Sequence, residues 1–210
     1  MTNIKNIDKS NLRQVILDFP DQFKIGFELA KKTKISGKFR SVCVSGMGGS
    51  ALSADILKDY ISYLNTKNPK KNKLFPLYQN RTYNLPPEAY NYDLNIFASY
   101  SGNTEETLKS LNDAIKNNLP SIGISHGGKL MEICKKNNLT HIQLPCVIQP
   151  RLALGYFFSV MLKILNNEKF LEDTSKEIIP LTENLKKNIT KLEAQGKKIA
   201  KLLGGKTPII

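Results

Sequence analysis

Tryptophan is absent from this 210-residue chain, and it has only three cysteines and two histidines. The cysteines, Cys43, Cys134 and Cys146, are odd in number and show no Cys-x-x-Cys spacing. This pattern excludes a disulfide-stapled scaffold and predicts reduced, mostly buried thiols in a cytoplasmic protein. No cysteine and histidine cluster has metal-ligand spacing, so we expect no metal and no cofactor.

Long hydrophobic runs are also missing. The longest apolar-leaning stretch, 152–162, lies between Arg151 and Lys163. A membrane-spanning helix needs about 20 such residues, so the sequence predicts no span and no membrane partner. The first residues, MTNIKNIDKSNLRQ, carry charges throughout and lack the apolar centre of a secretion signal.

Acidic residues are few: 18 Asp and Glu stand against 31 Lys and Arg, which gives a net charge of +13. Such an excess makes nucleic acid a candidate partner. However, the excess is spread along the chain, and no basic stretch alternates with exposed aromatic residues as in a stacking platform. One local cluster occurs in an Asn- and Pro-containing loop: Lys67, Lys70, Lys71 and Lys73. We interpret the charge as favouring solubility and anionic metabolites, with nucleic acid a poor alternative.

Short β-rich runs alternate with helical patterns. The expected strands are 41–45, 74–78, 94–98, 121–125 and 141–144. Helices are expected over 12–18, 22–34, from Ser50 as a cap through Tyr60, through 108–115, and over 130–136. This alternation predicts right-handed crossovers and an α/β sandwich with a five-stranded parallel sheet covered on both faces.

Two further helices are expected after the last strand. The first, over 151–165, is apolar on most sides, so we expect it to be buried against the sheet or a partner subunit. The second is long and amphipathic, follows Pro180 and ends at Gly204-Gly205. The last five residues, 206–210, read as the opening of another strand.

The first strand-to-helix junction reads Gly46-Met47-Gly48-Gly49-Ser50-Ala51. Its GxGxxA pattern is compatible with a dinucleotide-binding fingerprint, which needs an acidic residue at the end of the second strand. The sequence there is Tyr78-Gln79-Asn80-Arg81, without a carboxylate, and no Walker-type Gly-Lys-Ser/Thr follows the glycines. Taken alone, this junction favours a tight turn with a helix cap.

The second junction, Ser99-Tyr100-Ser101-Gly102-Asn103-Thr104-Glu105-Glu106-Thr107, is rich in hydroxyls. Backbone N–H groups at a helix N-terminus carry a partial positive charge and lack partners within the helix. Together with Ser and Thr hydroxyls they form a cradle for a phosphate dianion. A cap needs one hydroxyl and this loop has four, so we favour phosphate binding. Glu105 and Glu106 are better explained as partners of the helix dipole.

Three segments, GMGGSALSADIL, FASYSGNTEETL and LPCVIQPRLALGYFF, resemble the first half of the bifunctional phosphoglucose/phosphomannose isomerases. These enzymes belong to the sugar isomerase (SIS) domain superfamily, and the resemblance covers about residues 40–165 with all three motifs in order. It implies a flavodoxin-like SIS domain over 37–165. Helices over 1–36 would pack on this domain, and 166–210 would form a crossover to a second SIS domain that is absent.

The resemblance also implies the site and the reaction. Phosphate and sugar would be held by the following residues: Gly49, Ser50, Ser99, Ser101 and Thr104. The activity implied is aldose–ketose isomerisation of glucose 6-phosphate or mannose 6-phosphate to fructose 6-phosphate, in glycolysis and gluconeogenesis, by a cytoplasmic homodimer.

Arg151 would face the reacting carbons, because a fixed guanidinium stabilises an enediolate without losing its own proton. The alternative is a surface residue that begins a helix. The base and the ring-opening histidine are expected beyond Ile210, so this chain alone should isomerise very poorly or not at all. His126 lies near the presumed site, as a substrate contact or a simple loop residue, and His141 is expected to be structural. The second functional hypothesis is a non-catalytic sugar-phosphate-binding SIS module or regulator.

Overall fold

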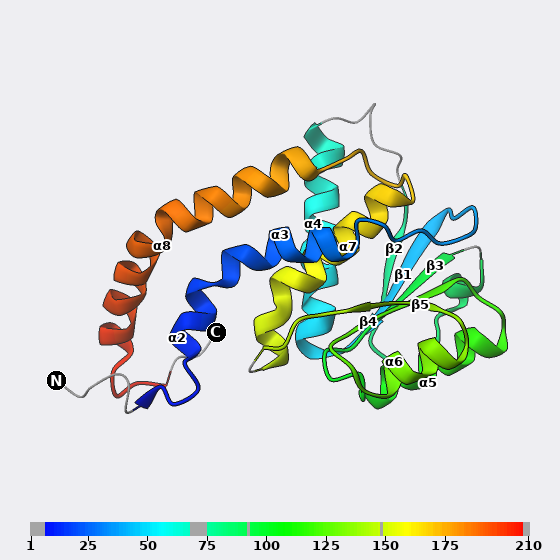
Figure 1. Cartoon of the computed structure of the whole chain (residues 1–210), viewed down its shortest axis with the longest axis horizontal. Helices are drawn as coiled ribbons and strands as arrows, with labels where there is room; N and C mark the ends of the chain where they lie inside the picture. The colour runs from blue at the N-terminus through cyan, green and yellow to red at the C-terminus, as the bar shows by residue number, and fades with distance from the viewer. Residues whose placement is uncertain (1–6, 68–74, 92, 148, 208–210) are drawn as a thin grey trace.

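Five parallel strands form one sheet (Figure 1). The strands are β1 (Ser41–Gly46), β2 (Leu77–Asn80), β3 (Asp93–Ala98), β4 (Ser121–Ser125) and β5 (Thr140–Gln143). Their order, β2-β1-β3-β4-β5, is that of flavodoxin-like sheets. The computed structural model describes residues 7–67, 75–91, 93–147 and 149–207. The predicted α/β sandwich with a five-stranded parallel sheet is confirmed.

Helices cover both faces of this sheet (Figure 1). They are α2 (Leu12–Leu17), α3 (Phe19–Leu29), α4 (Gly48–Lys67), α5 (Glu105–Lys116), α6 (Gly128–Lys136), α7 (Leu154–Asn167) and α8 (Ser175–Leu203). Two 3₁₀ turns, η1 (Pro87–Tyr90) and η2 (Pro150–Ala153), precede β3 and α7. Helices α4 and α7 lie on one face, with α3 packed on α7, and α5 and α6 lie on the other.

The α4/α7 face of the sheet holds the larger core. Strand side chains alternate between faces, so Val42, Leu94 and Ile122 point together toward these helices and are fully buried. Helix α7 adds Phe157 and Met161, both fully buried. The prediction that this apolar helix is buried is therefore confirmed, and its cover comes from within the chain.

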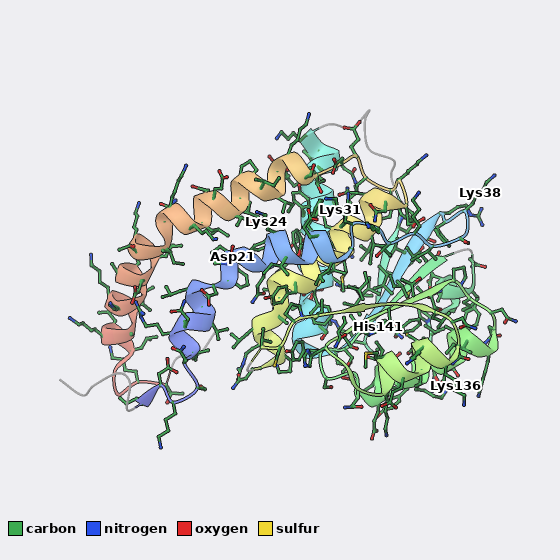
Figure 2. The ribbon with its side chains drawn as sticks, in the orientation of Figure 1. Asp21, Lys24, Lys31, Lys38, Lys136 and His141 are labelled. Carbon is green, nitrogen blue, oxygen red and sulfur yellow. The ribbon has the colours of Figure 1, made fainter. Side chains whose placement is uncertain are left out.

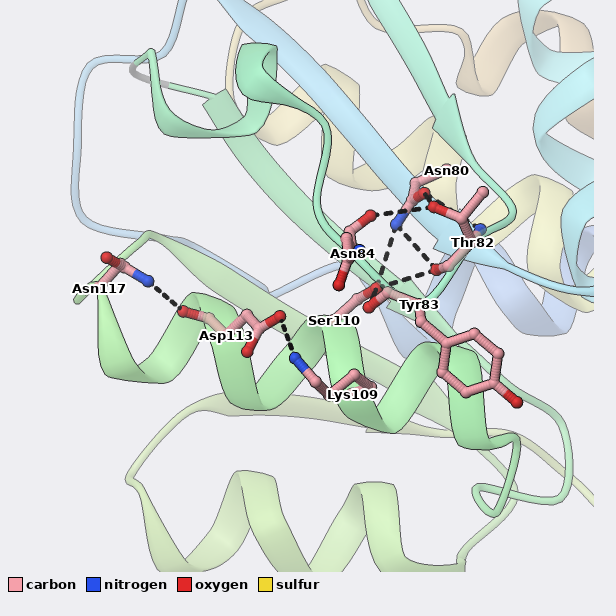
Figure 3. Close-up of polar contacts among 8 residues, drawn as sticks. All are labelled: Asn80, Thr82, Tyr83, Asn84, Lys109, Ser110, Asp113 and Asn117. Carbon is pink, nitrogen blue, oxygen red and sulfur yellow. Dashed lines mark hydrogen bonds and ion pairs between the residues drawn. The ribbon is translucent and has the colours of Figure 1, made fainter.

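The α5/α6 face combines a smaller core with buried polar groups. Asn80, at the end of β2, is 5% exposed and donates from Nδ2 to Ser45 Oγ at 3.3 Å and Ser110 Oγ at 3.1 Å. Its Oδ1 accepts from Thr82 N at 3.1 Å and Thr82 Oγ1 at 2.8 Å. Figure 3 shows the bonds of Asn80 to Thr82 and to Ser110, which fasten the loop after β2 to α5. Hydrogen bonds thus replace part of the apolar packing on this face.

At the opposite, amino-terminal edge of the same face lie buried acceptors. Asp93, which is 1% exposed, and Asn95 belong to β3 and sit beneath η1. Both carboxylate oxygens of Asp93 and Oδ1 of Asn95 lack a hydrogen-bond partner. Burial, together with the charge of Glu88, raises the pKa of Asp93 to about 6.

Two of the three cysteines are buried and one is exposed, and all are free thiols. Burial raises the pKa of Cys43 to about 12 and that of Cys134 to about 11. Both thiols are therefore protonated at neutral pH and behave as small apolar core residues. Cys146 is the exposed one.

Several element boundaries differ from the sequence-based prediction. Helix α3 begins at Phe19, because Pro20 suits the first helical turn, and it ends at Leu29 rather than near Lys34. Strand β2 is shifted to Leu77–Asn80, and Leu74 lies outside the described residues. Helix α8 begins before Pro180, which is tolerated within the helix at the loss of one backbone hydrogen bond.

Some sequence features fall on residues that the structure does not describe: three lysines of the basic cluster (Lys70, Lys71, Lys73) and the end of the proposed last strand (208–210). Elsewhere the positive charge is dispersed. Figure 2 labels lysines at well-separated places, including Lys24 on α3, Lys38 before β1 and Lys136 on α6. No helix of the described residues is both long and apolar enough to cross a membrane.

Helix α8 runs along α3 and continues past it toward α2 (Figure 1). Two ion pairs join these helices: Arg13 to Glu193 at 2.9 Å and Lys186 to Asp21 at 2.5 Å. Between α8 and the α2–α3 pair lies a cavity of about 940 Å³ with a mainly apolar lining. The division into 1–36, 37–165 and 166–210 stays a prediction.

Candidate functional site

The two glycine- and hydroxyl-rich junctions begin side by side at the carboxyl edge of the sheet. Strands β1 and β3 are parallel neighbours, with Ser45 opposite Phe97 and Gly46 opposite Ala98. The loops that leave these strands therefore start next to each other. In open α/β sheets, this edge is where ligands bind.

The loop after β3 holds two of its hydroxyls together. Ser99 is 1% exposed, and its Oγ lies 2.8 Å from Thr104 Oγ1. Thr104 occupies the cap position of α5, yet its side chain makes no capping bond to a backbone N–H of that helix. The hydroxyl pair thus leaves the N–H groups of the first turn of α5 without a side-chain cap. Ser101 is exposed, and its Oγ accepts a hydrogen bond from Asn103 N at 3.2 Å.

This loop interlocks with the turn before α6. Gly102 and Gly128 have φ angles of +70° and +72°, a region that favours glycine. A Cβ on Gly102 would lie 1.8 Å from Gly127 O, so no larger residue fits. Leu130 N donates to Gly102 O at 2.9 Å, and Lys129 N donates to Asn103 Oδ1 at 3.1 Å. The shape of the hydroxyl loop is therefore fixed by its neighbour.

The loop after β1 contacts both other parts of the predicted site. Ser50 is 4% exposed, and its Oγ accepts a hydrogen bond from Tyr100 N at 3.3 Å. Ser50 lies inside α4, which begins at Gly48, so its predicted role as the helix cap is wrong. At Gly49 a Cβ would lie 3.0 Å from Arg151 Cα. A glycine here lets the backbone of Arg151 approach the start of α4 closely.

Arg151 lies on η2, next to the start of α4, and its side chain is exposed. Its Nε donates to Gln149 Oε1 at 2.7 Å. The junction between η2 and α7 is held by Gln22 of α3, which is 3% exposed. Gln22 Nε2 donates to Leu152 O at 2.6 Å, and its Oε1 accepts from Gly155 N at 3.1 Å. Nothing in the sequence around Gln22 indicates this contact, which spans 130 residues.

His126 follows β4 at the same edge. Its backbone N donates to Tyr100 O at 2.9 Å, and its ring stacks on that of Tyr100 with centroids 5.6 Å apart. The ring Nδ1 lies 2.9 Å from Leu144 O. Because a carbonyl only accepts, Nδ1 carries the proton of this bond. His126 is thus tied to the loop that carries the hydroxyls.

His141 has a different place and a different role. It lies on β5 (labelled in Figure 2), and its Nε2 is 2.8 Å from Ser125 Oγ. Ser125 donates to Gly127 O, so His141 Nε2–H is the donor to Ser125. Burial lowers the pKa of His141, which favours this neutral form. The chain of bonds supports the turn before α6, as expected for a structural histidine.

Glu105 and Glu106 occupy the first turn of α5. Glu105 Oε2 accepts from the Tyr83 hydroxyl at 3.4 Å, and Glu106 raises the pKa of Tyr83. Their position agrees with the prediction that they complement the helix dipole. Among the hydrogen bonds of the described residues, none places a carboxylate on Arg151 or on the hydroxyls of the loop after β3. The same residues include no group of three His, Cys, Asp or Glu that could hold a metal ion.

The fold is that of SIS phosphosugar isomerases. A crystal structure assigned as a phosphosugar isomerase from Clostridium difficile 630 superposes with a TM-score of 0.63 at 12% identity, covering 91% of this chain and 56% of that one. A protein from Clostridium novyi NT, assigned as a tagatose-6-phosphate ketose/aldose isomerase, gives 0.62 at 19% identity, with 89% and 52% covered. No protein-family model matches the chain.

Sequence comparison identifies homologues within this class. A bifunctional phosphoglucose/phosphomannose isomerase from Caldicellulosiruptor bescii is 32% identical over 205 residues, which are 93% of this chain and 58% of the relative. One from Aquifex aeolicus is 30% identical over 88% of this chain and 53% of its own. The chain is thus a homologue of the bifunctional phosphoglucose/phosphomannose isomerases, and the resemblance seen in the motifs is confirmed. It spans little more than half the length of these relatives.

A further relative carries a different name. A D-glucosamine-6-phosphate 4-epimerase from Sulfolobus acidocaldarius is 30% identical over 165 residues, which are 78% of this chain and 49% of the relative.

Proposed function

We propose that this chain is the phosphate-binding half of an enzyme that interconverts glucose 6-phosphate or mannose 6-phosphate with fructose 6-phosphate. The observation that carries the proposal is the start of α5. The hydroxyls of Ser99 and Thr104 are hydrogen-bonded to each other there. Neither side chain therefore caps the backbone N–H groups of the first turn of α5. Uncapped N–H groups at a helix N-terminus, with hydroxyls beside them, suit a phosphate dianion.

In this proposal the loop after β1 carries the sugar chain, and Arg151 acts at the reacting carbons. Moving a proton between C1 and C2 passes through an enediolate, whose negative charge a guanidinium stabilises. The close approach of Gly49 to Arg151 and the bond between Ser50 and Tyr100 support a shared site, because they join all three segments. The base and the ring-opening histidine come from outside these 210 residues, and the working enzyme is a cytoplasmic homodimer.

The test is a calorimetric titration with fructose 6-phosphate. The Ser101→Ala/Thr104→Ala double variant removes two hydrogen bonds to a charged group. If their contributions add, it should lose about 3–6 kcal/mol of binding free energy. The matched control is Ser62→Ala/Thr66→Ala, which removes one serine and one threonine hydroxyl from an exposed part of α4. Equal binding by the double variant and the wild type would refute the phosphate-site assignment.

A second candidate is a non-catalytic sugar-phosphate-binding module. It is favoured by the lack, among the described residues, of a carboxylate bonded to Arg151 or to the phosphate-binding hydroxyls. A coupled isomerase assay separates the candidates when the part of the homologues that these 210 residues do not span is supplied in trans. Activity that then appears and is lost in Arg151→Ala supports the enzyme, whereas binding without turnover in every combination supports the module.

A further inference from the structure

Tyr100 is the point where the three segments of the candidate site meet. It stands between Ser99 and Ser101 in the hydroxyl loop and is 8% exposed. Its backbone N donates to Ser50 Oγ, which belongs to α4, and its backbone O accepts from His126 N. The main chain of Tyr100 therefore joins the loops that follow β1, β3 and β4.

The side chain of Tyr100 reaches a further segment, the loop that follows β5 and leads to Arg151. Its hydroxyl lies 3.2 Å from Pro145 O and 3.3 Å from Val147 O, and it accepts a hydrogen bond from Val147 N. A hydroxyl has one proton and two lone pairs, so it donates to one of these carbonyls while it accepts from Val147 N. Burial raises the pKa of Tyr100, which keeps this donor protonated. Val147 stands four positions before Arg151.

Other contacts of the described residues also hold the segment around Arg151. Gln22 fixes the backbone at Leu152 and Gly155, Gly49 packs against Arg151 itself, and Ser53 Oγ donates to Leu154 O at 3.4 Å. Ser50, next to Gly49, links this side to the hydroxyl loop indirectly, whereas the Tyr100 hydroxyl is a direct contact between that loop and the segment that leads to Arg151. This tie matters because the substrate sets one fixed span between its phosphate and the carbons that exchange a proton.

We propose that Tyr100 is a positioning residue, whose hydroxyl sets Arg151 at the correct distance from the phosphate-binding hydroxyls. This inference rests on the proposed function. Tyr100 contacts neither phosphate nor enediolate through its side chain and acts through the backbone of 145–147. The consequence is a split effect: loss of the hydroxyl spares phosphate affinity and weakens interactions made by Arg151.

The ligand test uses two probes. Inorganic phosphate reports on the hydroxyl loop, and a phosphorylated five-carbon sugar acid, whose carboxylate carries charge where the enediolate would, reports on Arg151. Tyr100→Phe keeps the ring stacked on His126 and removes only the hydroxyl. It should bind phosphate within twofold of the wild type and lose about tenfold in affinity for the sugar acid, as expected for a group displaced by a fraction of an ångström.

Two comparisons sharpen this result. In an Arg151→Ala background, Tyr100→Phe should cause no further loss, because the tyrosine acts through the arginine. Tyr60→Phe removes another bonded tyrosine hydroxyl, which donates to Glu177 Oε2 at 2.6 Å, and it should leave both affinities unchanged. Equal losses with both probes, additive losses in the double variant, or unaltered sugar-acid binding would each overturn the inference.

A ligand-free measurement separates this inference from the proposed function. Backbone amide hydrogen exchange at 146–147 and 151–153 should become faster in Tyr100→Phe, and exchange at 105–116 in α5 should stay the same. Unchanged exchange at 146–147 and 151–153 overturns the positioning role. If the wild type fails to bind the sugar acid while exchange responds as expected, the proposed function fails and the tie between the two loops stands.

Discussion

The two faces of the central sheet are stabilised by different chemistry. On the face covered by α4 and α7, the strands present aliphatic side chains to a large, fully buried core. On the face covered by α5 and α6, the same strands present Ser45, Asp93 and Asn95 beside a smaller core. The difference teaches that the first face provides most of the apolar stabilisation. The second face places loops through hydrogen bonds, and the hydroxyl loop of the candidate site leads into one of its helices.

The strongest test of this comparison is a cavity on the apolar face. Phe157 of α7 is fully buried in the larger core. Phe157→Ala should lower the free energy of unfolding by about 3–5 kcal/mol, because packing and transfer free energy are both lost. Denaturant unfolding followed by circular dichroism measures this loss. Leu202→Ala is the control, since Leu202 is 70% exposed, and a loss as small as that of the control would contradict the comparison.

On the polar face, the expected losses are smaller and come from hydrogen bonds. Asn80→Ala leaves Ser45 Oγ and Ser110 Oγ without their buried donor and frees the loop that Figure 3 shows. We expect a loss of about 1–3 kcal/mol in the free energy of unfolding. Asn117→Ala removes an exposed amide that donates to Asp113 O on the same helix. If Asn80→Ala and Asn117→Ala lowered the free energy of unfolding equally, the buried hydrogen bonds of Asn80 would contribute no more than an exposed one.

A third effect, similar in size to that of Asn80→Ala, has the opposite sign. The pKa of Asp93 rises from 3.8 to about 6 on folding, so the native state favours the protonated acid. The contribution of Asp93 to stability is therefore full below about pH 4 and decreases as the pH rises toward 6, where the buried carboxylate ionises. Asp93→Asn should raise the free energy of unfolding at pH 7 by about 2 kcal/mol and have little effect at pH 4.

The groups around Asp93 provide the control. Glu88 raises its pKa, Arg40 lowers it, and the Cys43 thiol beside it is protonated at neutral pH. Glu88→Gln should shift the pH at which stability falls to a lower value, because one negative charge is removed. Unfolding curves between pH 4 and 7 that run parallel for wild type and Asp93→Asn would show that this carboxyl does not titrate in the native protein.

Local patterns in the sequence predicted much of the fold. The strand at 121–125 was placed at its observed bounds, because Ser121 and Ser125 flank a short β-rich run. The bounds of α3 were wrong because Pro20 reads as a stop in sequence, although it suits the first turn of a helix. The predicted start of helix α8 was too late for a related reason, since Pro180 lies inside the helix.

The candidate site was predictable where its residues follow strands directly. The family resemblance assigned Ser50 and Ser99 to one site, and the pairing of β1 with β3 brings the segments that carry them together. The contacts of Gln22, and of the Tyr100 hydroxyl with Val147, were not predictable. They join segments separated by 130 and 47 residues, and no periodicity within either segment reports on the other. Such long-range polar contacts are fixed by tertiary packing.

The strand order also has a consequence for how the chain folds. Every strand pair encloses at least one connecting element, and the separations differ: Ile122 pairs with Thr140, 18 residues on, whereas Val42 pairs with Leu94, 52 residues on. Closing the longer loop costs about 1 kcal/mol more in chain entropy. The pair with the longer loop, β1 with β3, is the one whose ends carry the two junctions of the candidate site. The most distant pairing in the sheet is thus the one that assembles the edge of the candidate site, and we expect that edge to form late in folding, after β4 and β5 have joined.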